Sequence, residues 1–267
     1  MALPFDRYVM EIVTQTDLLR AVLQDADLTT AVPTCPGWNV GQLAHHVGGG
    51  QLWAAAAVQR RVQEPLPEDE FGFREPSGHP VEDPADLDFW LGASAAKLSG
   101  ALAAAGPELP LWTPLPTTPT SDYYARRCTH EALVHRTDAT LALGREADLS
   151  VDPVVAADAI DEWLEFVSLP VLFEHYPEAR EVLGEGRTLH FHATDTPEDL
   201  HAEWVVDLTG DTITWRRAHE KAAVAARGPL TELLLVIYRR RPLAEANVEV
   251  LGEGELLELW LERVRFG

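Results

Sequence analysis

The chain has 267 residues, of which 46% are hydrophobic and 24% are charged, and its formal net charge is -22. This length and composition indicate a globular protein with one large domain or two smaller ones, and with enough apolar residues for a core that needs no disulfides. The acidic excess argues against nucleic acid or an anionic membrane as a partner, because both bind clusters of Lys and Arg. The apolar stretches are shorter than the ~20 residues needed to cross a bilayer.

The cysteines and the N-terminus suggest a cellular location. Cys35 and Cys128 are too few for a disulfide framework, and the first residues lead into a helical pattern without the basic and apolar regions of a secretory signal. We therefore expect a cytoplasmic protein.

The first half of the chain predicts helices separated by proline-rich segments. From Phe5, apolar residues recur at the i, i+3, i+4 spacing of a helical face. The prolines and glycine of 32–38 break the chain before Asn39, which is a good N-cap. Proline-rich segments predict a long surface loop at 65–84 and an extended segment at 107–119. We expect helices at 5–25, 40–61, 84–106 and 122–143, which suggests a four-helix bundle.

The second half has a different pattern. A fifth helix is expected at 153–166, as a bridge between domains. From Arg187 onward, apolar and polar residues alternate with period two, which predicts strands, including a hairpin. The expected elements are strands at 188–193, 204–208 and 212–215, a helix at 229–239, a strand at 247–251 and a helix at 254–263. The predicted fold class is α+β, with a helical bundle over 1–170 and a smaller α+β domain over 171–267.

One face of the expected fourth helix is rich in polar residues. Glu131 and His135 are four residues apart, so their side chains lie on adjacent turns of the same face. Tyr124, Cys128 and Asp138 fall in the same sector, which is unusual for a bundle helix. A solvated face or an ordinary i, i+4 contact would give the same spacing.

The second helix carries a histidine in its apolar stripe. Val40, Leu43 and Val47 define the inward face, and His46 lies within it and should be buried, whereas His45 points elsewhere. A lone inward histidine is commonly a hydrogen-bonded core residue. An inward histidine and an inward Glu/His pair in the same bundle point to a different role, because bundle metal sites are built on facing helices.

Together, His46, Glu131 and His135 offer two imidazoles and one carboxylate. This set matches a catalytic zinc site, which has three protein ligands and one open position. Asp138, one turn after His135, either orients that imidazole or makes an exposed contact. Cys128, one turn before Glu131, is either a fourth ligand or a packed side chain.

Two further histidines lie on one expected strand. His190 and His192 are two residues apart, so they share one face of the strand at 188–193. They have no carboxylate partner nearby in the sequence, and we therefore interpret them as structural.

Five segments carry distinctive motifs, namely VPTCPGWNV (32–40), LAHHVGG (43–49), RRCTHE (126–131), HRTDA (135–139) and LLLVIYRRRP (233–242). In order and over nearly the whole chain, they resemble the motifs of the mycothiol-dependent maleylpyruvate isomerase family. The resemblance implies a DinB-like metal-binding four-helix bundle joined to a small α+β domain. It places the family's metal ligands on His46, Glu131 and His135, the three residues that the helical faces had selected.

The resemblance also implies an active-site arginine in the second domain. It falls within the triple Arg239, Arg240 and Arg241, most closely on Arg240. Where the family usually has Trp-Gly before the arginines, this chain has Tyr238 and Arg239, so the register remains open. Alternatively, the three arginines form a basic patch at a helix C-terminus, where cations are favoured.

The implied cofactors are zinc and the thiol mycothiol. A zinc-bound thiol is held as a thiolate, which would add to the cis double bond of a dicarboxylate; the resulting single bond rotates, and elimination gives the trans isomer. An arginine would hold a substrate carboxylate through paired hydrogen bonds. A metal at this site could also act as a Lewis acid or supply hydroxide.

Three functions remain open. The first is a zinc- and mycothiol-dependent isomerase acting on a small unsaturated keto acid. The second is a mycothiol S-transferase acting on electrophiles, which the acidic surface slightly favours because it disfavours anionic substrates. The third is a non-catalytic metal-binding or ligand-sensing protein. The expected partners are a small-molecule substrate and a thiol, without nucleic acid or membrane, and the protein is expected to be a monomer or homodimer.

Overall fold

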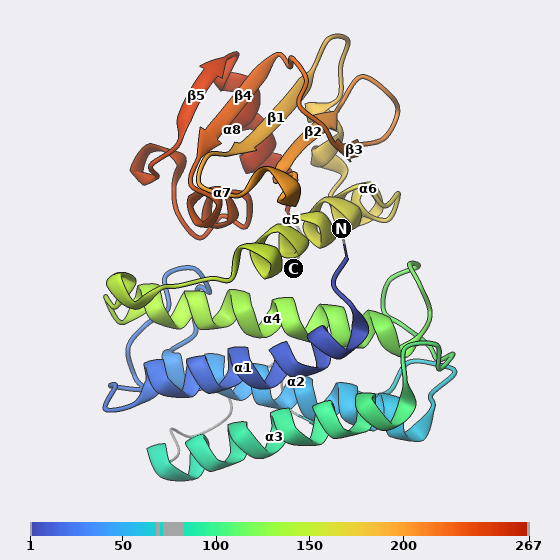
Figure 1. Ribbon diagram of the computed structural model, residues 1–267, viewed down its shortest axis with the longest axis vertical. Helices are drawn as coiled ribbons and strands as arrows, with labels where there is room; N and C mark the ends of the chain where they lie inside the picture. The colour runs from blue at the N-terminus through green and yellow to red at the C-terminus, as the bar shows by residue number, and fades with distance from the viewer. Residues whose placement is uncertain (1, 68–69, 72–82, 266–267) are drawn as a thin grey trace. The chain divides into compact units, whose positions relative to one another are not determined.

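The structure is a computed structural model that describes residues 2–67, 70–71 and 83–265, so most of the loop expected at 65–84 lies outside the described residues. The chain divides into two compact units, Leu3–Ser150 and the residues from Val151 onward. The first is helical and the second contains a sheet, which confirms the predicted α+β fold class (Figure 1). Within the described residues, no helix is long and apolar enough to cross a membrane.

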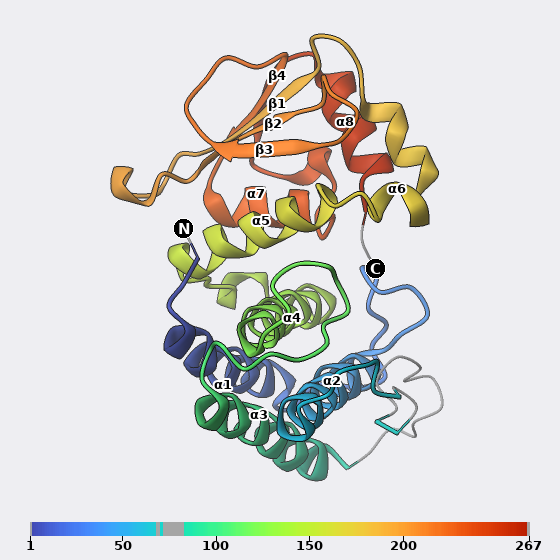
Figure 2. The same cartoon turned by 90° about the vertical axis from the view of Figure 1, so that its right-hand side faces the viewer.

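The N-terminal unit is a helical bundle. Within it, α1 packs against α3 and α4, and α2 packs against the same two helices (Figures 1 and 2). The Asn39 side chain accepts a hydrogen bond from the Gln42 backbone N–H, while the Gln42 side chain accepts one from the Asn39 N–H, so α2 begins with a capping box. Every end lies within two residues of its predicted position: α1 (Phe5–Leu23), α2 (Val40–Arg60), α3 (Pro84–Ala105) and α4 (Ser121–Ala142).

The bundle core contains a close approach between α2 and α3. Leu43 and Leu91 are completely buried in this core. A Cβ atom placed on Gly48 of α2 would lie 2.3 Å from the ring of Trp90 on α3. The two helices can therefore pack at this distance only because residue 48 has no side chain.

The C-terminal unit is a mixed sheet with helices. Its helices are α5 (Pro153–Val167), α6 (Leu172–His175), α7 (Leu230–Ile237) and α8 (Gly254–Arg263), and its strands are β1 (Thr188–Ala193), β2 (Glu203–Asp207), β3 (Thr214–Arg217), β4 (Val224–Gly228) and β5 (Glu249–Gly252). In the described residues the strand order is β3-β2-β1-β4-β5. Strand β1 pairs in parallel with β4, and the other neighbours are antiparallel. The sequence did not predict β4.

The two faces of β1 differ in chemistry. Phe191 lies in the core of the unit, where its ring centroid is 5.4 Å from that of Trp260 on α8. Because side chains alternate along a strand, His190 and His192 project from the opposite face.

Helix α5 belongs to the C-terminal unit. The hydroxyl of Tyr238, directly after α7, donates a 2.8 Å hydrogen bond to the carbonyl of Ala159, and its ring lies 4.9 Å from that of Trp163. The structure thus divides the chain between residues 150 and 151, whereas the predicted division between 170 and 171 placed α5 with the bundle. The reason for the difference is that the buried face of α5 packs on α7.

Candidate metal centre

The three predicted metal ligands come together in the bundle. Oε1 of Glu131 on α4 lies 3.1 Å from Nε2 of His46 on α2 and 3.1 Å from Nε2 of His135 on α4. One potential ligand atom from each residue lies within 4.8 Å of the others. The structure therefore joins two imidazoles and a carboxylate, the donor set that suits a catalytic divalent metal.

The two neighbouring histidines of α2 are buried differently from the prediction. The side chain of His46, predicted to be buried, is 16% exposed, and its ring lies 4.8 Å from that of Trp38 in the segment before α2. His45, which was expected to point elsewhere, is the more buried of the two at 8%, and its ring lies 4.9 Å from that of Trp90. His46 can therefore contact both Glu131 and an ion or molecule that enters from solvent.

An arginine fixes the orientation of the central carboxylate. Arg127, one turn before Glu131, donates from Nη2 to Oε2 of Glu131 at 2.6 Å. The other carboxylate oxygen, Oε1, therefore faces the two imidazoles. Loss of solvent would raise the pKa of Glu131, but Arg127 and His135 outweigh it and hold the pKa well below its ordinary value. Glu131 is therefore an ionised carboxylate, the form that binds a metal.

A buried carboxylate fixes the orientation of His135. Oδ2 of Asp138 lies 2.9 Å from Nδ1 of His135, and the Thr34 hydroxyl donates a 2.7 Å hydrogen bond to Oδ1 of Asp138. Burial lowers the pKa of His135, but Glu131 and Asp138 outweigh it and raise this pKa well above its ordinary value. The sequence identified Asp138 as a candidate for this role, but it gave no signal for Thr34.

The two cysteines form no disulfide and lie in different surroundings. Sγ of Cys35 is 3.6 Å from Oδ2 of Asp138, and Cys35, His135 and Asp138 form a second group of potential ligands on the Nδ1 side of the imidazole. Asp138 is fully buried, so this second group is less accessible than the group that contains His46. Among the described residues, Cys128 belongs to no such group.

The arginines that follow α7 end the helix and make different contacts. Arg239 adopts a left-handed backbone conformation with φ 60°, and the Arg240 N–H donates to the Leu235 carbonyl at 2.7 Å, an arrangement typical of a Schellman motif. Nη1 of Arg240 donates to the Tyr238 carbonyl at 2.7 Å, and Nη1 of Arg241 lies 2.6 Å from Oε1 of Glu232. The guanidinium groups of Arg240 and Arg241 therefore have different partners.

A helical unit that joins two imidazoles to a carboxylate, followed by a small mixed-sheet unit, defines a two-domain class of protein with a candidate metal centre in its bundle. Residues 9–140 match the model of the mycothiol maleylpyruvate isomerase N-terminal domain, and residues 154–259 match that of the MDMPI C-terminal domain. The chain therefore belongs to the mycothiol-dependent maleylpyruvate isomerase family.

Solved structures share this fold over nearly the full length. A crystal structure of the mycothiol-dependent maleylpyruvate isomerase is 16% identical, with a TM-score of 0.58 and coverage of 94% of this chain and 95% of that chain. A histidine-to-alanine mutant of such an isomerase is 15% identical, with a TM-score of 0.59 and coverage of 92% and 93%. A search of curated proteins gave no match.

Proposed function

We propose that this protein is a zinc-dependent enzyme that uses mycothiol as a nucleophile and isomerises a small cis-unsaturated keto acid of the maleylpyruvate type. The observation that carries the proposal is the convergence of His46, Glu131 and His135 on one point in a member of this family. Two solved structures that share this fold bear the name of that isomerase.

The residues present fit a zinc ion. Two Nε2 atoms and one carboxylate oxygen face one another, and neighbouring groups orient both His135 and Glu131. When bound, zinc would lower the pKa of a coordinated thiol and so keep it as the nucleophilic thiolate.

The surrounding residues would prepare the site for this chemistry. Asp138 would hold His135 with Nε2 directed at the ligand position, and Arg127 would keep Oε1 of Glu131 directed at the same position. Arg240 is the residue that we propose binds a substrate carboxylate, since a guanidinium can pair both of its oxygens.

A second candidate function is a mycothiol S-transferase acting on an electrophile. The net charge of -22 favours it, because a strongly acidic protein repels a dicarboxylate unless local cations attract it. The proposal also includes a cytoplasmic location, which agrees with two cysteines that form no disulfide.

Metal analysis of the purified protein and a thiol-dependent turnover assay test the proposal. We expect bound zinc and mycothiol-dependent loss of maleylpyruvate. Conjugates with other electrophiles, without isomerisation, would instead support the S-transferase, and zinc without any thiol-dependent reaction would leave a metal-binding or ligand-sensing role.

Variants at the ligands make the test specific. His46→Ala should lose metal and activity together while the helical circular dichroism signal is kept, because the bundle has its own apolar core. Full zinc content and full turnover in this variant would contradict the ligand assignment. His175→Ala, at an exposed histidine outside the bundle, is the control.

A further inference from the structure

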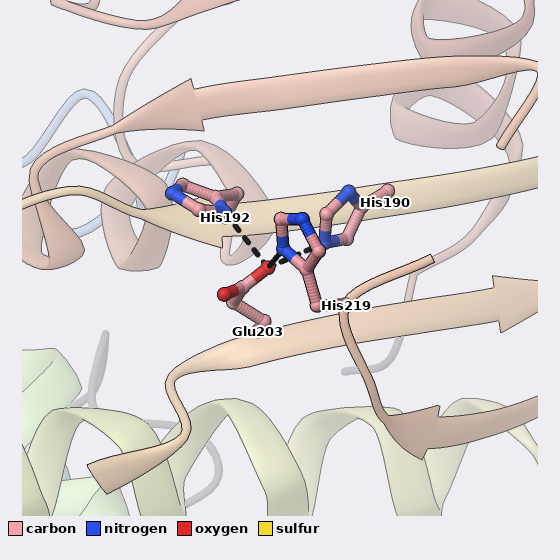
Figure 3. A group of neighbouring side chains, drawn as sticks. All are labelled: His190, His192, Glu203 and His219. Atoms are coloured by element: carbon pink, nitrogen blue, oxygen red, sulfur yellow. Dashed lines mark hydrogen bonds and ion pairs between the residues drawn. The ribbon is translucent and has the colours of Figure 1, made fainter. Parts of the chain in front are cut away.

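A second group of metal-ligating side chains lies on the sheet of the C-terminal unit. Figure 3 shows three imidazoles directed at the carboxylate of Glu203. Oε2 of this carboxylate lies 2.9 Å from Nε2 of His190, 2.7 Å from Nδ1 of His192 and 2.6 Å from Nδ1 of His219. One potential ligand atom from each of the four residues lies within 4.8 Å of the others.

Strand pairing brings these residues together from distant parts of the sequence. His190 and His192 share one face of β1, and His192 stands opposite Glu203 in the antiparallel register with β2. His219 follows β3, where the Ala218 N–H donates to the Glu203 carbonyl at 3.2 Å, so the chain is held beside β2. Three neighbouring segments of the sheet thus contribute to one cluster.

Hydrogen bonds to Glu203 alone do not explain this convergence. A carboxylate oxygen offers about two lone-pair directions. Here three imidazole nitrogens approach the same oxygen, and each must carry a proton to donate to it. A divalent cation at the centre would satisfy all of these groups with the imidazoles neutral.

The distances also suit a metal. Ligand atoms around a tetrahedral ion with bonds of about 2.0–2.1 Å are separated by roughly 3.3 Å. The contacts of 2.6–2.9 Å to Glu203 Oε2 would have to widen by about 0.4–0.7 Å to reach this separation. His219 can make this adjustment, since its side chain is 78% exposed.

We propose that His190, His192, Glu203 and His219 form a second site for a divalent transition-metal ion, with Zn²⁺ as the ion that best suits three imidazoles and one carboxylate in a tetrahedron. Four protein ligands complete such a tetrahedron, which is the property of structural zinc sites. The ion would therefore link β1, β2 and the segment after β3, and stabilise the sheet.

Zinc stoichiometry of the full-length protein tests this site. The key comparison is between the wild type and His219→Ala, with metal content and isothermal titration with Zn²⁺ as readouts. His219→Ala should bind one equivalent fewer at micromolar zinc, because loss of a direct ligand should cost at least the roughly 100-fold in affinity that loss of an outer partner can cost. The control is His175→Ala, an exposed histidine of the same unit that lies outside the cluster, which should bind as the wild type does.

The test separates this site from the bundle centre. The His46→Ala/His135→Ala double variant removes two bundle ligands, and it should still bind one zinc equivalent that disappears when His219→Ala is added. Zinc should also raise the thermal unfolding midpoint of His175→Ala more than that of His219→Ala. Co²⁺ should give the visible absorption of a tetrahedral site in the double variant.

Two results would overturn the proposal. One is a zinc stoichiometry in His219→Ala equal to that of the wild type. The other is an absence of zinc or cobalt binding below millimolar concentration in the folded double variant, which would show a hydrogen-bonded cluster without a metal. Glu203→Gln, which keeps the size of the side chain, repeats the comparison if His219→Ala fails to fold.

Discussion

Asp138 and His135 form a buried pair in which Oδ2 of the carboxylate lies 2.9 Å from Nδ1 of the imidazole. Because Asp138 holds Nδ1, the nitrogen that faces Glu131 is Nε2. Asp138 is thus not one of the proposed metal ligands, but it sets the orientation of one of them, His135.

The Asp138→Asn substitution tests this relationship. We expect zinc affinity to fall about 10- to 100-fold, the range for loss of an outer partner of a ligating histidine. Thr34→Val, which removes one hydrogen bond to Asp138, should cause a smaller loss. Isothermal titration measures both, and equal affinity in Asp138→Asn and wild type would show that the pair has no role in metal binding.

Arg240→Ala tests the proposed carboxylate-binding residue. We expect kcat/KM to fall by an amount equivalent to about 2–5 kcal/mol, the range for truncation of a buried charged pair. Arg241→Ala should mainly reduce stability, because its guanidinium pairs with Glu232. Steady-state kinetics of both variants decide between the two arginines, and equal small losses would favour a basic patch.

Arg239→Gly should stabilise the protein. Arg239 has φ 60°, a conformation that costs an L-residue about 1 kcal/mol and that glycine adopts freely. Part of this gain is offset by the greater chain entropy of glycine in the unfolded state. Chemical denaturation should show a small increase in the free energy of unfolding, whereas a decrease would contradict the strain argument.

Gly48→Ala should destabilise the bundle although alanine favours helices. The new Cβ would lie 2.3 Å from Trp90, and such overpacking costs about 1–3 kcal/mol, more than the ~1 kcal/mol gained in helix propensity. Gly100→Ala on α3 is the matched control, since its Cβ would meet nothing within 4 Å and the substitution should stabilise. Urea denaturation of the two variants should therefore give changes of opposite sign.

Asp161→Ala should strongly destabilise the C-terminal unit. The carboxylate of Asp161 is nearly buried. It accepts a hydrogen bond from Nε1 of Trp204 at 2.7 Å and pairs with Nη2 of Arg217 at 2.8 Å. Leaving the guanidinium without its partner should cost about 3–5 kcal/mol in the free energy of unfolding. Glu220→Ala breaks the exposed ion pair of the adjacent Arg216 and should have no measurable effect on the same denaturation curve.

The sequence predicted the helices better than the sheet. Local signals marked the helix ends, such as the Asn39 cap before α2 and the Asp152 cap before α5. Strand β4, with the sequence VAARG, was missed because it has no alternation of apolar and polar residues and consists mainly of small side chains. Its place beside β1 depends on a parallel pairing between distant segments, which a local pattern does not reveal.

The same limit applies to the two candidate sites. Glu131 and His135 could be selected because they are one helical turn apart, and His46 because it lies in an apolar stripe. The spacing of His190 and His192 was also visible, but their interpretation as structural rested on the lack of a nearby carboxylate. Glu203 becomes their neighbour only through the register of β1 and β2.

The strand order also constrains how the protein is assembled during synthesis. β1 is made first but lies at the centre of the sheet, between β2 and β4. One edge of β1 therefore has no partner strand until β4 (Val224–Gly228) has left the ribosome. The helices of the bundle, in contrast, all come from one earlier stretch of the chain. We infer that the bundle folds first, and that the open edge of β1 is the point at which a nascent chain is most exposed to aggregation or chaperone capture.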